Sequence, residues 1–186
     1  FMFANSGITS INLSNYNTEN VEDMKYMFYN CDSLQYLNLS NFNTSKVKNM
    51  TSMIQDCKTL KTLDISNFDC SHLNHSISFF KNSPALLYLN LSGVNISHIT
   101  DISYMFYGFS SIISLDFSDL DTSSVNNMEF LFGNCIKLVS LNLSTLNTAN
   151  TINMHGMFSN CQSLTELNLS TFFTDNVTDM TSMFQN

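Results

Sequence analysis

The stretch Leu34–Cys57, LQYLNLSNFNTSKVKNMTSMIQDC, is the unit from which nearly the whole chain is built. Its Leu39 position recurs every 26 residues, always followed by serine, without insertion or deletion from Ile8 onward. A fixed period of this length is the signature of a solenoid, in which each unit buries its apolar side against its neighbours. We therefore expect residues 1–186 to form a single array of about seven units. The recurring apolar residues are Leu13, Leu39, Ile65, Leu91, Phe117, Leu143 and Leu169.

Both ends of the sequence fall inside a unit. Met2-Phe3 repeats Met27-Phe28, and Asn186 corresponds to Asn160. Solenoids need polar caps at their ends, and neither end has the composition of a cap. We expect the chain to be a piece of a longer solenoid, with any export signal or anchor outside it.

The first half of each unit has the pattern of a β-strand. Leu37 and Leu39 alternate with Asn38, which is the period of a strand with one buried face. Seven equivalent strands, one per unit, must run parallel to one another. At about 4.8 Å between strands, the sheet should be on the order of 30 Å long.

The second half has helical spacing. At about 100° per residue, Val47, Met50, Met53, Ile54 and Cys57 fall on one side of a helix, which predicts a short amphipathic helix per unit. Threonines precede it where an N-cap is expected. The predicted fold is an α/β leucine-rich-repeat solenoid with a parallel sheet on the concave face and short helices on the convex face. The expected N-caps are Thr44, Thr122, Thr148 and Thr174.

The two middle units are less regular than the others. Ser76 and Ile102 replace the first methionine, and Phe79 replaces the second methionine of its unit. Ser83 and Phe109 replace the cysteine. We expect the fold to persist there with looser or rearranged packing.

The Leu-x-x-Leu-x-Leu strand pattern matches leucine-rich repeats unit by unit. Its extension, LxLSxFxTxxVxxMxxMFxxCxxL, is best preserved across Leu13–Leu34, Leu39–Leu60, Phe117–Leu138 and Leu143–Leu164. In this it resembles the BspA-like family of surface leucine-rich-repeat proteins, including the 26-residue repeats of bacterial surface lipoproteins. The resemblance implies a secreted or cell-surface protein with an adhesin-like binding role. Phe42 and its equivalents stand where standard leucine-rich repeats have asparagine, so the turn geometry should differ.

Composition and charge exclude a nucleic-acid binder. The net charge is −8, with seven lysines and no arginine, so the basic footprint that neutralises phosphates is absent. No stretch is long and apolar enough to span a bilayer, so we expect no membrane insertion within this segment. Beyond Gly93 there are eight acidic residues and a single lysine, Lys137. We interpret this as a solvated acidic surface in preference to an acidic docking patch.

The five cysteines have three possible roles. Cys31, Cys57, Cys135 and Cys161 share one repeat position, whereas Cys70 stands alone. Cys31 should lie near Cys57, and Cys135 near Cys161, but with side chains pointing the same way, which is unfavourable for a disulfide. Close pairs typical of metal sites are absent. Buried free thiols are therefore the preferred interpretation, with disulfides and a metal site as the alternatives.

No residue pattern indicates catalysis or a cofactor. The four histidines, at positions 72, 75, 98 and 155, accompany no nucleophile pattern. Phosphate loops, HExxH and GxSxG are absent. The methionines take inward positions and are predicted to fill the core. We expect a protein that is not an enzyme and has neither cofactor nor metal.

The outward residues of the predicted strands are the candidate binding surface. Solenoids present extended concave surfaces to partners, and exposed tyrosines are natural anchors. The alternative is that the Asn/Asp column only forms hydrogen bonds along the sheet. The candidate residues are Tyr36, Asn38, Thr62, Asp64, Tyr88, Asn90, Asp116, Asn142, Glu166 and Asn168.

The expected function is binding of a protein or cell-surface ligand through the concave sheet. The expected location is the cell surface or the extracellular space, with adhesion to host or matrix proteins or to other cells. The alternative is a structural spacer that presents another domain.

Overall fold

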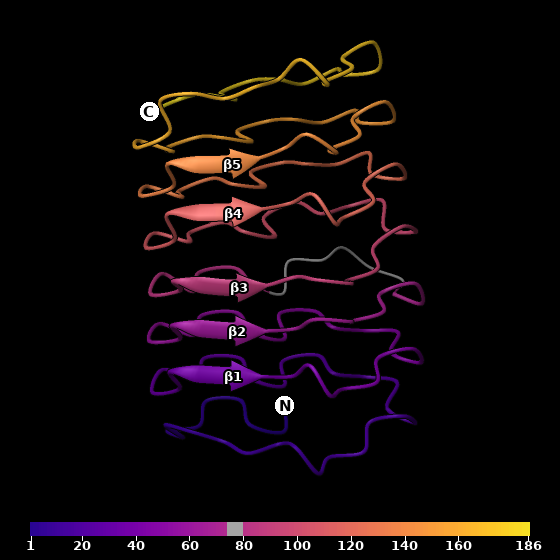
Figure 1. The fold of residues 1–186 in the computed structure, drawn as a ribbon, viewed down its shortest axis with the longest axis vertical. Helices are drawn as coiled ribbons and strands as arrows, with labels where there is room; N and C mark the ends of the chain where they lie inside the picture. Colours follow the sequence, from indigo (N-terminus) through magenta and orange to yellow (C-terminus); the bar gives the residue numbers. More distant parts are fainter. Residues whose placement is uncertain (74–79) are drawn as a thin grey trace.

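The computed structural model describes residues 1–73 and 80–186, which form a stack of coils of 26 residues each. Figure 1 shows the coils lying one above another along the long axis, from the N-terminus at one end to the C-terminus at the other. The irregular residues Ser76 and Phe79, and also His75, lie outside the described ranges.

Five short parallel strands lie on one side of the stack, one per coil. Their register is 26 residues, so that Leu37 pairs with Leu63 and Leu63 with Leu89. The middle residue of each strand points into the molecule, and the two flanking residues point outward. The predicted strand pattern is therefore confirmed at five of the seven expected positions. The strands are β1 (Tyr36–Asn38), β2 (Thr62–Asp64), β3 (Tyr88–Asn90), β4 (Ser114–Asp116) and β5 (Ser140–Asn142).

The core is a set of identical columns that run along the stack. In one of them the phenylalanine rings of successive coils are stacked, at 5.7 Å between Phe106 and Phe132 and again between Phe132 and Phe158. Nine of the eleven methionines are buried beside these columns, whereas Met2 and Met180 are exposed. Because a solenoid has no globular centre, burial of each apolar side chain depends on the coil above and below it.

The prediction of helices on a convex face is wrong. The described residues contain no helix, and the second part of each coil, here called the turn half (residues 44–57 and their equivalents), is a series of turns. Its N–H groups donate to carbonyls of the next coil: those of Ile102, Tyr104, Phe106 and Gly108 do so at 2.8–3.0 Å. The fold is therefore not an α/β leucine-rich-repeat solenoid but a stack of strands and turns.

Left-handed backbone positions explain why no helix forms. Ser52 and Asp56, both within the stretch predicted to be a helix, have φ values of 51° and 61°. A left-handed residue ends right-handed helical geometry, and here two of them lie within one turn half. Successive turns also place every third residue inward, as shown by the hydrogen bond from the Met53 N–H to the Met50 carbonyl (3.1 Å). The same spacing therefore arises without a helix.

Three of the four expected N-cap threonines, all except Thr174, instead link their coil to the next one. The buried Thr122 hydroxyl donates to the Asn147 carbonyl (3.0 Å) and accepts the Asn147 N–H (2.9 Å) in the next coil. Thr18, Thr44 and Thr148 make the same pair of bonds with their next coils. Cys70 occupies the threonine position of its own coil, which is why the sequence showed it apart from the other cysteines.

Strand pairing stops between β3 and β4, so that the five strands form one sheet of three and another of two. The bond from the Leu87 N–H to the Lys61 carbonyl, and its counterpart from Val139 to Ile113, have no equivalent from Ile113 to Leu87. Figure 1 shows a wider step at this level, here called the seam. The rearranged packing predicted for the two middle coils is thereby found beside the second of them, whereas β2 and β3 still pair in regular register.

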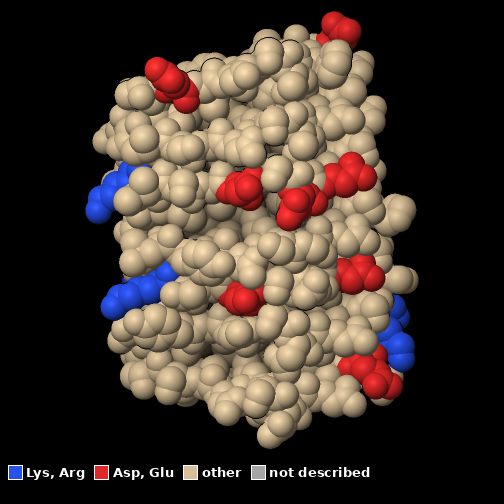
Figure 2. Space-filling model, viewed as in Figure 1, with Lys and Arg blue, Asp and Glu red and all other residues tan. Residues whose placement is uncertain are grey.

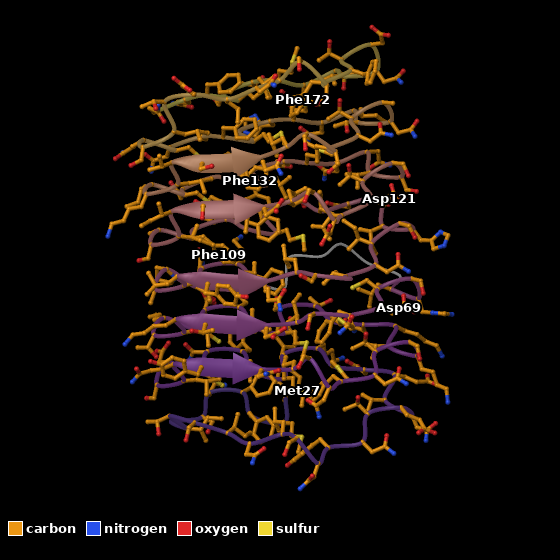
Figure 3. All side chains as sticks on the ribbon, viewed as in Figure 1. Met27, Asp69, Phe109, Asp121, Phe132 and Phe172 are labelled. Carbon is orange, nitrogen blue, oxygen red and sulfur yellow. The ribbon has the colours of Figure 1, made fainter. Side chains whose placement is uncertain are left out.

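We attribute the seam to two aromatic side chains. Phe109 stands where other coils have cysteine or serine and packs against Phe106 at 5.8 Å. Phe117 replaces an aliphatic residue and contacts Phe132 at 5.7 Å between ring centroids. Figure 3 places Phe109 at the level between β3 and β4. Because a close-packed core cannot absorb such volumes, the strand side opens.

Two further expectations are not met. The segments at Ile11–Leu13 and Leu167–Leu169 do not form strands, so the sheet is shorter than expected. The predicted concave face depended on helices wider than strands, which the described residues do not have. The outward side of the five strands is therefore called the strand face below.

Candidate binding surface

The outward residues of the strands lie on the surface as predicted. Tyr36 and Tyr88 are each more than half exposed, at 59% and 56%. Ser114, Ser140 and Glu166 continue this column as exposed residues, whereas Thr62 is half-buried. The tyrosines thus stand on different sheet levels, separated by the coil of Thr62.

The neighbouring Asn/Asp column has a structural role at the end of each strand. The Asn38 Oδ1 accepts the Ser40 N–H at 2.9 Å, and Asp64 accepts the Ser66 N–H at the same distance. Such Asx turns redirect the chain out of the strand. Among the residues that the structure describes, a single sideways bond joins strands in this column, from Asn142 to Asp116 at 3.3 Å. The same turn-closing bond is made by Asn90, Asp116, Asn142 and Asn168.

A row of exposed apolar side chains beside the tyrosine column was not predicted. Leu87, Ile113 and Val139 are 59%, 61% and 52% exposed and occupy the same position in three successive coils. We call these three residues, together with Tyr88, the apolar ridge. The sequence signal is a pair of apolar residues before each of these strands, of which only the first is buried, as in Leu86-Leu87.

Acidic residues flank the carboxyl ends of the strands. Asp116 ends β4, and Asp119 and Asp121 follow in the next turn. Hydrogen bonds from the backbone N–H and the hydroxyl of Ser118 hold the pKa of Asp116 below its usual value, so the carboxylate stays charged. Figure 2 shows acidic side chains at several levels of this view and lysines at its edges.

The acids of the two parts of the chain differ in their partners. Glu22 and Asp32 pair with lysines one coil further on, Lys48 at 2.7 Å and Lys58 at 2.9 Å. Among the described residues, none of the ion pairs involves Asp116, Asp119 or Asp121. These three carboxylates therefore have no ion-pair partner among the described residues.

A hollow lies at the corner before the strands. Its volume is about 490 Å³, and its lining includes Asn82, Pro84, Tyr107 and Asn134. The polar groups there pair with one another: Asn134 donates to the Tyr107 hydroxyl, and Asn160 donates to Asn134 at 2.6 Å. The amides of Asn134 and Asn160 are therefore already engaged within the chain.

All five cysteines are buried free thiols, as the preferred interpretation predicted. The Cys57 thiol donates to the Phe28 carbonyl of the preceding coil at 3.1 Å, and Cys135 does the same to Phe106 at 3.3 Å. Burial raises the pKa of Cys57 and of Cys70 to about 12. Such thiols are protonated at neutral pH and serve packing.

The matches to a family model cover residues 1–114 and 108–186, which together span the whole chain. The chain belongs to this family, described as "Mycoplasma protein of unknown function, DUF285". The two matched ranges of this DUF285 chain overlap at residues 108–114, the segment that leads into β4. A comparison with curated proteins finds no match. Within the described ranges, no helix has the length and apolar character needed to cross a membrane.

Proposed function

We propose that this DUF285 chain is a non-enzymatic binding module that recognises a protein or cell-surface ligand through its strand face. The observation that carries the proposal is the set of large apolar and aromatic side chains exposed there, Tyr36 and the apolar ridge. Contiguous exposed apolar side chains on a soluble surface mark an interaction site. Tyrosine in particular is enriched among residues that dominate binding energy.

The rest of the strand face is suited to support such contacts. Asx turns fix the ends of the strands, so the outward side chains sit on an ordered backbone. A rigid platform lowers the entropy lost when a partner binds. The candidate residues with exposed polar groups, such as Asn38 and Glu166, would then form the rim around the apolar contacts.

The proposed location is the cell surface or the extracellular space, with adhesion to host proteins, matrix proteins or other cells as the role. The support is the resemblance of the 26-residue unit to BspA-like surface repeats. Antibody labelling of intact cells that produce the complete protein tests this location. Labelling only after permeabilisation would contradict it.

Adhesion of beads coated with the chain, to cultured epithelial cells and to immobilised matrix proteins, tests the binding role. The double variant Tyr36→Ala/Tyr88→Ala should reduce bead retention roughly tenfold, because two aromatic anchors are lost. Ile152→Ala is the matched control, since Ile152 is 47% exposed in a turn half, away from the strands. It should leave retention unchanged.

The spacer is the competing function. Wild-type beads that adhere no better than uncoated beads, or a double variant that adheres as well as wild type, would favour it. Thermal unfolding of both variants serves as the folding control, because substitutions at exposed positions should change the free energy of unfolding by less than about 0.5 kcal/mol.

A further inference from the structure

The apolar ridge is not needed for the core. Leu87, Ile113 and Val139 lie outside the cluster of packed apolar residues, although each follows a buried leucine or isoleucine. The outer coils have polar residues at the same position, Gln35 and Lys61 on one side and Thr165 on the other. A packing role would apply to every coil alike, so the ridge is a local property of three coils.

The seam adds unpaired backbone groups beside the ridge. Since β3 and β4 are not paired, the N–H and carbonyl groups that face each other across the seam lack the ladder bonds found between β4 and β5. A hollow of about 110 Å³ lies at its carboxyl end, lined by residues that include Leu89, Asn90, Asp116 and Asp119. A partner at the ridge therefore meets apolar side chains and polar acceptors together.

The charge beside the ridge selects the partner. Asp116 and Asp119 line the hollow, and the ion pairs of the described residues leave both without a lysine partner. Opposite charge across an interface steers encounter and disfavours wrong partners. A second copy of this chain would bring the same acids together on a molecule of net charge −8, which opposes self-association through this face.

We infer that the apolar ridge is the main contact of the strand face, and that its partner is a protein segment with apolar side chains next to a lysine or arginine. The apolar side chains lie on Leu87, Ile113 and Val139, and the basic side chain lies against Asp116 and Asp119 beyond the strand ends. This inference rests on the proposed binding function and adds the position and the chemistry of the partner.

Selection of a random twelve-residue peptide library on the immobilised full chain tests the inference. Peptides enriched on the wild type should combine lysine or arginine with aliphatic or aromatic residues. Their affinity should fall at least tenfold on Leu87→Ser/Ile113→Ser and roughly tenfold on Asp116→Asn/Asp119→Asn. Higher ionic strength should weaken binding to the wild type and should have less effect on the Asp116→Asn/Asp119→Asn variant.

The matched controls are Glu19→Gln/Asp175→Asn, which removes two acids far from the ridge, and Ile152→Ser. Both should leave peptide binding unchanged. Enriched peptides that are acidic or neutral, or that bind the ridge variant as tightly as the wild type, overturn the inference while the binding function stands. If those peptides instead lose affinity on Tyr36→Ala, the contact lies elsewhere on the strand face.

Two other outcomes would overturn the binding function or the inferred partner. A library in which no sequence is enriched, together with unchanged bead adhesion for every strand-face variant, overturns the binding function itself. A mass twice that of the monomer in light scattering, lost in Leu87→Ser/Ile113→Ser, shows that the ridge binds a second copy and overturns the inferred partner.

Discussion

The two halves of each coil differ in how they join neighbouring coils, and the seam shows which of them holds the stack together. On the strand side, the backbone ladder is interrupted between β3 and β4. In the turn half of the same coils, the N–H groups of Ile102, Tyr104, Phe106 and Gly108 still donate to the next coil. At the seam, the turn half therefore keeps neighbouring coils bonded to each other, whereas the strand side does not.

This difference follows from what each half can tolerate. A three-residue strand makes few bonds and separates when large side chains such as Phe109 and Phe117 lie beneath it. The turn half combines backbone bonds with buried hydroxyls, thiols and stacked rings, so one altered position leaves many others in place. The ridge is exposed on the half that carries less of the stacking.

The largest effect is expected for Phe132→Ala. Phe132 is fully buried between Phe106 and Phe158 in the turn-half stack, and its removal should lower the free energy of unfolding by about 3–5 kcal/mol. Urea denaturation followed by circular dichroism measures it. Phe184→Ala removes the exposed last ring of the same column and should have a much smaller effect. Equal losses would contradict a stack held by buried rings.

Hydrogen exchange should show the seam directly in the wild type. The amides of Ile113 and Ser114 lack the bond to the preceding coil that Val139 and Ser140 have, so they should exchange roughly a hundredfold faster. Mass spectrometry with overlapping peptides resolves the two segments. Equal protection at both places would mean that β3 and β4 pair in solution and that the two halves of the coil are equivalent.

A smaller effect is expected for Thr122→Val. The change keeps the shape but leaves the N–H and carbonyl of Asn147 without their partner, which should lower stability by about 1–3 kcal/mol. Chemical denaturation measures the loss. Thr145→Val is the control, because that threonine is exposed and its hydroxyl bonds only the Ser118 carbonyl. A loss at Thr145 as large as at Thr122 would argue against the buried hydroxyl as an inter-coil link.

Alkaline pH should weaken the turn half through its buried thiols. Burial raises the pKa of Cys57 from 9.0 to about 12, so the folded state binds the proton more tightly than the unfolded state. Its contribution is complete below pH 9 and is lost as the pH rises toward 12. At pH 10 this loss is about 1.4 kcal/mol for one such thiol.

The free energy of unfolding of the wild type and of Cys57→Ser, measured between pH 8 and pH 10, gives the contribution of this thiol. The next coil has serine at the equivalent position, Ser83, and its hydroxyl donates to the Ile54 carbonyl at 3.2 Å. The variant should lose less stability over this range than the wild type does. Parallel pH profiles would show that Cys57 titrates alike in the folded and unfolded states.

The candidate surface was only partly predictable. Alternation along a strand correctly placed Tyr36 and Tyr88 outward, because side-chain direction in a strand depends only on position. The ridge escaped prediction because Leu86-Leu87 and Ile112-Ile113 are pairs of adjacent apolar residues that precede the alternating part of the strand. The turn that leads into the strand decides which of the two adjacent apolar residues is buried. Contact with the neighbouring coil sets the geometry of that turn.

The sequence by itself determined the 26-residue period, the parallel register and the identity of the core columns, since these follow from spacing alone. It also contained a signal against the helix: Asn30, Asn82, Gly108, Asn134 and Asn160 recur before the cysteine position, and all have positive φ. Only the tertiary structure decided between helix and turns, because a three-residue apolar spacing fits both. In the turn half, the backbone N–H groups donate to carbonyls of the neighbouring coil, which lie within hydrogen-bonding distance, and so they do not form the bonds of a helix.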